Sequence, residues 1–175
     1  MSDVIEHYDA ISSVYDELYG EEQKRKYELL YRFLERGLLL DAGCGTGLLW
    51  EFLRSKKIYC KYIGIDVSSG MIRVARSRQQ KGCFLVGCVE YMPFRSGIFD
   101  YVVAITLVQN LLDVEAFVKE AVRVLKKGGL LIVTVLLKKR DIVADVLDAA
   151  SRNGLKLVHH VWEPYSADEA LVFVK

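Results

Sequence analysis

The chain has 175 residues, of which 52% are hydrophobic, 27% are charged and only two are prolines. This length and composition predict one domain over residues 1–175 and exclude a disordered or fibrous chain. The formal net charge of +1 argues against strong attraction of the whole molecule to nucleic acid, although it leaves a local basic patch open.

Short apolar runs alternate with amphipathic segments, the pattern of βα units that build a mostly parallel sheet. An amphipathic helix is expected over residues 21–36, with Gly37 as its C-cap. Strands are expected, in chain order, at 38–40, 62–65, 83–86, 101–106, 130–136, 155–161 and 170–174. Further helices are expected from Leu48, from Ser68 to about Arg78, over 114–125 and over 140–153, and Gly128 and Gly129 are expected to turn the chain into the fifth strand. The last two strands are close enough to pair, so we predict a seven-stranded α/β sheet with an antiparallel hairpin at one edge and helices on both faces.

The longest apolar run, residues 130–137, is too short to span a bilayer and predicts a buried strand. The polar, acidic first residues do not resemble a secretory signal. We therefore expect a cytoplasmic protein without a membrane segment. The four cysteines have no C-x-x-C spacing, which favours free thiols over a metal site: Cys44, Cys60, Cys83 and Cys88.

A glycine-rich turn follows the first expected strand, with Gly43, Gly45 and Gly47 at alternate positions. Ligands of open α/β sheets bind at such strand ends, and glycine lets the backbone approach them closely. The spacing differs from the G-x-G-x-x-G of dinucleotide sites because residue 48 is leucine. The carboxylate of Asp41 would repel a pyrophosphate but suits a cationic amine, such as the ammonium of S-adenosylmethionine. A P-loop is excluded because no Gly-Lys-Ser/Thr follows.

Asp66 ends the second expected strand about twenty residues after the glycines, where a carboxylate can accept both hydroxyls of a ribose. The alternative is a turn or helix-cap aspartate. The spacing favours an adenosine-type ligand without phosphate.

Four motifs in order now carry a family resemblance: residues 41–47 (DAGCGTG), 64–68 (GIDVS) with Met71, 92–94 (MPF) leading to 99–103 (FDYVV), and 123–129 (RVLKKGG). Over residues 8–140 the chain resembles the class I S-adenosylmethionine-dependent methyltransferases, nearest their small-molecule and quinone-type branch. The resemblance implies a Rossmann-like fold, S-adenosylmethionine as cofactor, and methyl transfer to an acceptor that the sequence does not identify.

The same resemblance assigns residues to the cofactor. Asp41 would lie near its amine, the glycines along its methionine part, Asp66 at the ribose, and Val67 and Met71 beside adenine. The full set is Asp41, Gly43, Cys44, Gly45, Gly47, Asp66, Val67, Met71, Cys88, Val89, Thr106 and Tyr15.

One departure from the family lies after the third strand. The family often has Gly-Asp-Ala there, and the aspartate accepts a hydrogen bond from the adenine amino group. This chain has Gly87, Cys88 and Val89, and a thiol is a weak acceptor. We expect weaker cofactor binding, with the neighbouring backbone still in contact with adenine.

Candidates for the acceptor end are fewer. Residues 1–36 resemble the family's tyrosine-bearing lid, so Tyr8, Tyr15 or Tyr19 could close over the sulfonium or the substrate, with ordinary helix packing as the alternative. Gln109 and Asn110 could orient a substrate or simply be solvated. The segment after the fourth strand has neither an Asn/Asp-Pro-Pro-Tyr/Phe box nor a Pro-Cys pair, which disfavours amide or exocyclic nitrogens and pyrimidine carbons as acceptors. We assign no catalytic base and no metal.

Partners and rival functions stay open. The third strand, residues 83–86, is apolar and expected at a sheet edge, which invites a homodimer or a small activator protein such as those of some RNA- or protein-modifying methyltransferases. A nucleic-acid substrate is suggested by Arg73, Arg76, Arg78, Lys81, Lys138, Lys139 and Arg140, which a solvated face explains equally well. A non-enzymatic scaffold fits the Cys88 departure, but the intact glycines and Asp66 argue against it.

Overall fold

A computed structural model describes residues 2–78 and 82–175 of the chain. Lys81 and the side chain of Arg140, two of the basic residues named above, lie outside this description. The helices are α1 (Ser2–Ile11), α2 (Tyr15–Leu30), α3 (Leu48–Ser55), α4 (Ser69–Arg78), α5 (Val114–Val124) and α6 (Arg140–Arg152), with 3-10 turns η1 (Tyr31–Phe33) and η2 (Val108–Asn110). The strands are β1 (Leu38–Ala42), β2 (Lys61–Asp66), β3 (Cys83–Val86), β4 (Phe99–Ile105), β5 (Leu125–Leu136), β6 (Lys156–Trp162) and β7 (Asp168–Val174).

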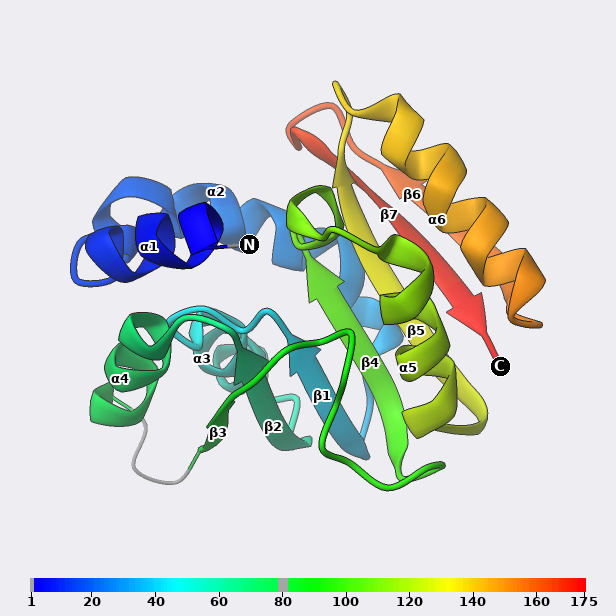
Figure 1. The fold of residues 1–175 in the computed structure, drawn as a ribbon, viewed down its shortest axis with the longest axis horizontal. Coiled ribbons are helices and arrows are strands. Elements are labelled where there is room, and N and C mark those ends of the chain that lie inside the picture. The colour runs from blue at the N-terminus through cyan, green and yellow to red at the C-terminus, as the bar shows by residue number, and fades with distance from the viewer. Residues whose placement is uncertain (1, 79–81) are drawn as a thin grey trace.

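The described strands form one seven-stranded sheet in the order β3-β2-β1-β4-β5-β7-β6 (Figure 1). The pairs from β3 through β5 are parallel, whereas β7 is antiparallel to both β5 and β6. The predicted sheet with a C-terminal hairpin is therefore confirmed.

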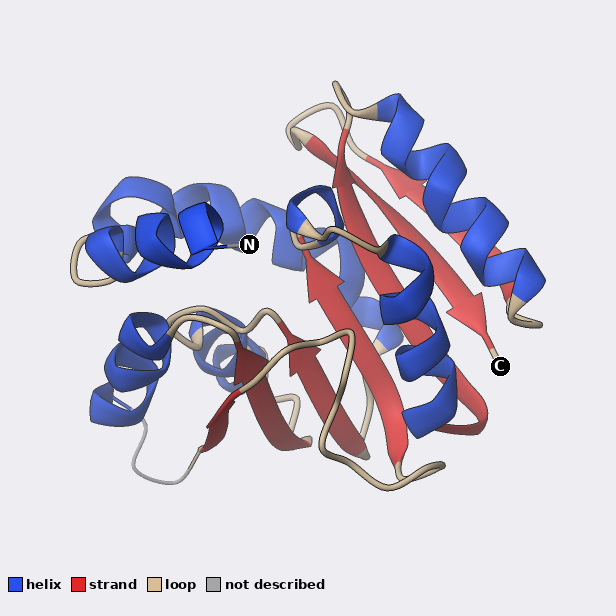
Figure 2. Cartoon of the chain, viewed as in Figure 1, coloured by secondary structure: helices blue, strands red, loops and turns tan. Residues whose placement is uncertain are grey.

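Helices cover both faces of the sheet, as the separate layers of Figure 2 show. Because successive side chains of a strand point to opposite faces, neighbouring residues enter different cores. Leu40 packs with residues of α5 and α6, such as Phe117 and Val146, while Leu39 packs with residues of α2, α3 and α4. Both leucines are fully buried, which explains why the central strands are apolar throughout.

The N-terminal region differs from the prediction. The helix expected over 21–36 begins at Tyr15 and ends at Leu30, and α1 precedes it. Gly37 is therefore not a C-cap. It lies directly before β1, where an added Cβ would stand 3.0 Å from the Cβ of Asp100 and from the ring of Tyr101. Close approach of these neighbours, not helix termination, requires glycine at this position.

The fifth strand also begins earlier than expected. β5 starts at Leu125, and Gly128, with φ of +80°, lies inside it where the pairing with β4 changes register. The predicted turn is thus an irregularity within the strand. No helix within the described residues is long and apolar enough to cross a membrane.

Candidate functional site

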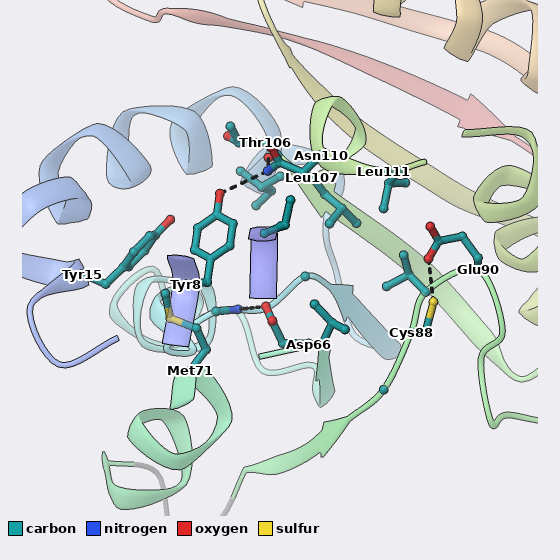
Figure 3. A pocket seen from close by; sticks show the side chains of 17 residues that line it. Tyr8, Tyr15, Asp66, Met71, Cys88, Glu90, Thr106, Leu107, Asn110 and Leu111 are labelled. Atoms are coloured by element: carbon teal, nitrogen blue, oxygen red, sulfur yellow. Dashed lines mark hydrogen bonds between the residues drawn. The ribbon is translucent and has the colours of Figure 1, made fainter. Parts of the chain in front are cut away.

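A pocket of about 830 Å³ opens at the carboxyl ends of β1 to β4 and is closed on one side by α1 and α2 (Figure 3). Its walls combine two N-terminal tyrosines, the glycine turn and the segments that follow β2, β3 and β4. The lining residues are Val4, Tyr8, Tyr15, Gly43, Gly45, Asp66, Val67, Met71, Gly87, Cys88, Val89, Glu90, Ile105, Thr106, Leu107, Asn110 and Leu111.

The glycine turn is fixed by backbone contacts to β2. The amides of Gly43 and Cys44 both donate to the carbonyl of Ile65, at 2.8 and 3.1 Å. Gly43 has φ of +75°, and an added Cβ would stand 2.8 Å from Cδ1 of Leu107. Both the backbone conformation and the close approach therefore require glycine at 43.

Asp66 joins the glycine turn to the start of α4. Its Oδ2 accepts from the amide of Gly45 at 2.9 Å, and its Oδ1 accepts from the amide of Ser68 at 2.9 Å. Burial raises the pKa of Asp66, and these two hydrogen bonds oppose that shift. The turn role and the pocket role, which the sequence left as alternatives, are thus combined in one side chain.

A second, smaller cavity of about 320 Å³ adjoins the pocket and shares Tyr15, Gly43, Gly45 and Ile105 with it. Asp41 lies here, only 2% exposed, and accepts a hydrogen bond from the hydroxyl of Tyr62. Burial raises the pKa of Asp41 to about 7. Among the ion pairs of the described residues none involves Asp41, so this buried carboxyl faces a cavity without a cation of its own.

The chain leaves β4 through an unusual turn at Thr106, which has φ of +54° although it is not glycine. Its amide donates to Oγ1 of Thr134 at 2.9 Å, and its hydroxyl accepts from Lys26 at 2.9 Å and donates to Asp168 at 3.0 Å. A residue in this conformation persists only when its surroundings hold it there. Three side chains from α2, β5 and β7 do so.

The turn at Thr106 in turn orients the wall of the pocket. Its carbonyl accepts from the side-chain amides of Gln109 at 3.0 Å and of Asn110 at 3.4 Å. The amide of Asn110 also donates to the hydroxyl of Tyr8 at 3.1 Å, which links the end of β4 to α1 (Figure 3). Burial raises the pKa values of Tyr8 and Tyr15, so both phenols stay protonated.

The N-terminal helices are tied to the sheet side of the pocket. Oδ1 of Asp9 accepts from the amide of Gly70 at 2.8 Å and from the hydroxyl of Ser68 at 2.5 Å, so a residue of α1 caps the start of α4. Asp16 of α2 accepts from Thr46 and pairs with Arg78. These contacts hold Tyr8 and Tyr15 over the pocket.

The expected cofactor residues fall into three groups. Most of them line the large pocket: Gly43, Gly45, Asp66, Val67, Met71, Cys88, Val89, Thr106 and Tyr15. Asp41 and Cys44 line the smaller cavity, whereas Gly47, with φ of +80°, is the N-cap of α3 and lines neither. Of the substrate candidates, Tyr8 and Asn110 line the pocket but Tyr19 and Gln109 do not.

With this geometry in hand, comparison with known proteins is informative. A family model described as a methyltransferase domain matches residues 40–133, more than half of the chain. The chain belongs to this methyltransferase family.

Relatives and solved structures agree with this assignment. The methyltransferase is 30% identical over 131 residues to the demethylmenaquinone methyltransferase of Thermotoga maritima, covering 64% of this chain and 57% of the relative. It spans about half to 60% of the length of the curated relatives it matches.

Two solved structures share its fold. One, a Thermotoga maritima protein described as a possible histamine N-methyltransferase, has a TM-score of 0.76 at 21% identity, with 98% of this chain and 99% of that chain covered. The other, a putative methyltransferase in complex with the Haloferax volcanii Trm112 activator, has a TM-score of 0.78 at 19% identity, covering 95% and 96%.

Several pocket residues of the methyltransferase were not predicted: Val4, Gly87, Glu90, Ile105, Leu107 and Leu111. Leu107 and Leu111 follow β4 at i, i+4 spacing, which could have indicated one shared face. Glu90 stands two residues after the unusual Cys88, and a carboxylate so close to a strand end was a usable signal. Val4 offered none, because its position depends on how α1 packs against the sheet.

Proposed function

We propose that this chain transfers the methyl group of S-adenosylmethionine to a small acceptor molecule. The supporting observation is a line of polar groups along the ends of three neighbouring strands. Asp41 belongs to β1, Asp66 ends β2, and residues 88–90 follow β3, in a sheet whose order is β3-β2-β1. The amine, ribose and adenine of S-adenosylmethionine follow one another in the same order.

The amine end of the cofactor fits the smaller cavity. A buried carboxyl that lacks a cationic partner is unfavourable when ionised, and a bound ammonium would remove that penalty. Asp41 is such a group, and the cavity it lines is continuous in its walls with the larger pocket. Asp41 therefore holds the ammonium in this proposal.

The ribose fits Asp66. Each carboxylate oxygen has two lone pairs, and the amides of Gly45 and Ser68 occupy one on each oxygen. The second pair on each oxygen is free to accept a ribose hydroxyl, while the two backbone contacts fix the direction of the carboxylate. Val67 and Met71 supply apolar surface beside it.

The segment after β4 would face the transferred group. When bound, S-adenosylmethionine supplies a methyl group already activated by its cationic sulfur, so holding the acceptor in line is the main task of the protein. Leu107 and Leu111 exclude water, and Asn110 and Thr106 offer polar groups that orient an acceptor.

General-base catalysis is not part of this proposal. Among the described residues after β4 that line the pocket, none carries a carboxylate or an imidazole. Tyr8 and Tyr15 are poor bases because burial raises their pKa values. The acceptor would present a free lone pair, or arrive already ionised.

Residues 1–36 act as a lid in this proposal, and residues 37–175 form the catalytic core of one cytoplasmic domain. Asp9 and Asp16 attach the two lid helices to α4 and to the glycine turn, across the same strand ends that hold the pocket. Such an attachment would close over a bound cofactor while still allowing it to exchange.

Calorimetric titration with S-adenosylmethionine and S-adenosylhomocysteine tests the proposal. We expect micromolar binding of both by the native protein and at least tenfold weaker binding by Asp66→Asn, which keeps the size of the side chain but removes its charge. The matched control Asp145→Asn makes the same change on the exposed side of α6 and should bind normally. Binding of neither ligand by the native protein would contradict the proposed function.

A second proposal concerns a partner at β3. This four-residue strand is an edge of the sheet, Cys83 is exposed and Val86 is 52% exposed. One structural neighbour is a putative methyltransferase bound to an activator protein, which supports an activator on this chain too. Light scattering should then show a monomer that gains mass when an activator of that kind is added. A dimer of the chain alone would favour self-pairing instead.

A nucleic-acid acceptor is less favoured. Two of the basic residues that suggested it already have internal partners, because Arg76 donates to the carbonyl of Phe84 at 2.6 Å and Arg78 pairs with Asp16. Their charges therefore serve contacts within the chain, and a small acceptor accords better with the apolar pocket.

A further inference from the structure

Glu90 is a buried carboxylate on the wall of the pocket. It is only 6% exposed, and it follows β3 on the same short segment as Gly87, Cys88 and Val89. Figure 3 shows its side chain beside that of Cys88, whose thiol donates to Oε2 at 2.7 Å. Nothing in the proposed transfer of the methyl group uses this pair.

The hydrogen bonding of Glu90 is weak for a buried charge. A buried carboxylate ordinarily accepts several hydrogen bonds from strong donors. Within the described residues, the side-chain donor to this carboxylate is a thiol, and a thiol is a weak donor. A carboxylate in this state gains free energy when a ligand brings an N–H group to it.

The order of the strands indicates which part of a ligand reaches Glu90. In the proposed function the amine lies at the end of β1 and the ribose at the end of β2. The next strand in the sheet is β3, and Glu90 follows its end. The ring attached to the ribose must therefore extend toward residues 87–90, away from the end of β4 where the acceptor would lie.

We propose that Glu90 accepts a hydrogen bond from the exocyclic amine of the purine ring, and that Cys88 positions it by donating from the thiol. This assignment rests on the proposed function. It makes Glu90 the residue that selects an amino-substituted purine, because a ring without that amine would leave the buried carboxylate without its donor. Cys88 itself then needs no contact with the ring.

The test compares two ligands that differ in one group: S-adenosylhomocysteine, and its analogue with hydrogen in place of the 6-amino group. Calorimetry should give the native protein a preference of about tenfold to a hundredfold for the amino ligand, the range for one hydrogen bond to a charged acceptor. Glu90→Met, apolar and of similar length, should reduce the preference to within about twofold. Glu90→Gln, which keeps a neutral acceptor, should give an intermediate value.

Two controls separate this role from general damage. Cys88→Ser keeps a donor to Glu90 and should preserve the preference. Asp66→Asn should weaken both ligands equally, because the ribose is common to them. Circular dichroism of each variant checks folding, and Glu90→Gln decides the question if Glu90→Met does not fold.

The outcomes are distinguishable. A preference that Glu90→Met and Glu90→Gln leave unchanged, with both ligands binding well, would overturn the role of Glu90 and leave the proposed function standing. Failure of the native protein to bind either ligand would contradict the proposed function and this assignment with it.

Discussion

The ammonium of Lys26 in α2 lies 2.9 Å from Oγ1 of Thr106, at the end of β4, although the two residues are far apart in the sequence. Lys26 is 2% exposed and also lies 3.3 Å from Oδ1 of Asp168, which is fully buried. One buried cation thus joins the lid, the turn after β4 and the C-terminal hairpin.

Loss of this cation should therefore be costly. Lys26→Met would leave the carboxylate of Asp168 buried without a counter-charge, and we expect the free energy of unfolding to fall by about 3–5 kcal/mol. Denaturant unfolding followed by circular dichroism measures this. In Lys24→Met, the same change on an exposed ion pair of the same helix, the loss should stay below about 1 kcal/mol. Equal losses in the two variants would show that the Lys26 network contributes no special stability.

The affinity for S-adenosylmethionine should rise with pH near neutrality. Burial raises the pKa of Asp41 to about 7 from its ordinary 3.8, so without ligand the group is largely protonated at pH 6. A bound ammonium favours the ionised form, so binding at pH 6 must first release a proton and binding above pH 7 need not. Titrations between pH 5.5 and 7.5 should show this rise, and Asp41→Asn should flatten it.

The same shift acts on stability with a definite sign. Between pH 3.8 and about 7 the unfolded chain has lost the proton of Asp41 while the folded chain still holds it. The contribution of Asp41 to the free energy of unfolding therefore falls as pH rises through this window and is constant above it. Asp41→Asn should lack this fall, so its stability relative to the native protein should increase from pH 4 to pH 7.

Gly43 and Gly97 offer a matched pair of substitutions. Both have positive φ, +75° and +66°, but an added Cβ at Gly43 meets Leu107 at 2.8 Å while one at Gly97 meets nothing within 4 Å. Gly97→Ala should lose about 1 kcal/mol of stability from backbone strain alone. Gly43→Ala should lose at least twice that and bind S-adenosylhomocysteine more weakly, because Leu107 must move into the pocket. Equal losses would argue that the contact with Leu107 is readily relieved.

Much of the fold could be predicted because the relevant signals are local. The apolar run around Leu39 and Leu40 predicts a strand buried on both faces, and the glycine turn with Asp66 predicts a ligand at the strand ends. The pocket brings most of these residues together. The bounds of the N-terminal helices could not be obtained in this way, because α1 is held by long-range contacts such as that of Asp9 with Gly70.

The site was less predictable where tertiary contacts decide. Thr106 looked like an ordinary strand residue, yet its positive φ depends on partners from three other elements. Glu90 lies in the pocket because the chain turns after β3, and neighbouring Tyr91 is 81% exposed. Nothing in the residue types alone separates these two positions.

The attachment of the lid through Asp9 gives a last prediction. Hydrogen bonds from Ser68 and Gly70 lower the pKa of Asp9, so the carboxylate is ionised and in place at neutral pH. Asp9→Ala removes the acceptor that caps α4, and α1 should then detach more often. We expect faster amide hydrogen exchange over residues 2–11 and cleavage there by a protease at low concentration, with little change in β1 to β5. Glu6→Ala, an exposed carboxylate of the same helix, is the control and should exchange like the native protein. Bound S-adenosylhomocysteine should slow the exchange in the native protein, because the ligand lies beneath Tyr8. If α1 in Asp9→Ala exchanges no faster than in Glu6→Ala, packing of Val4 and Tyr8, rather than the cap, holds the lid.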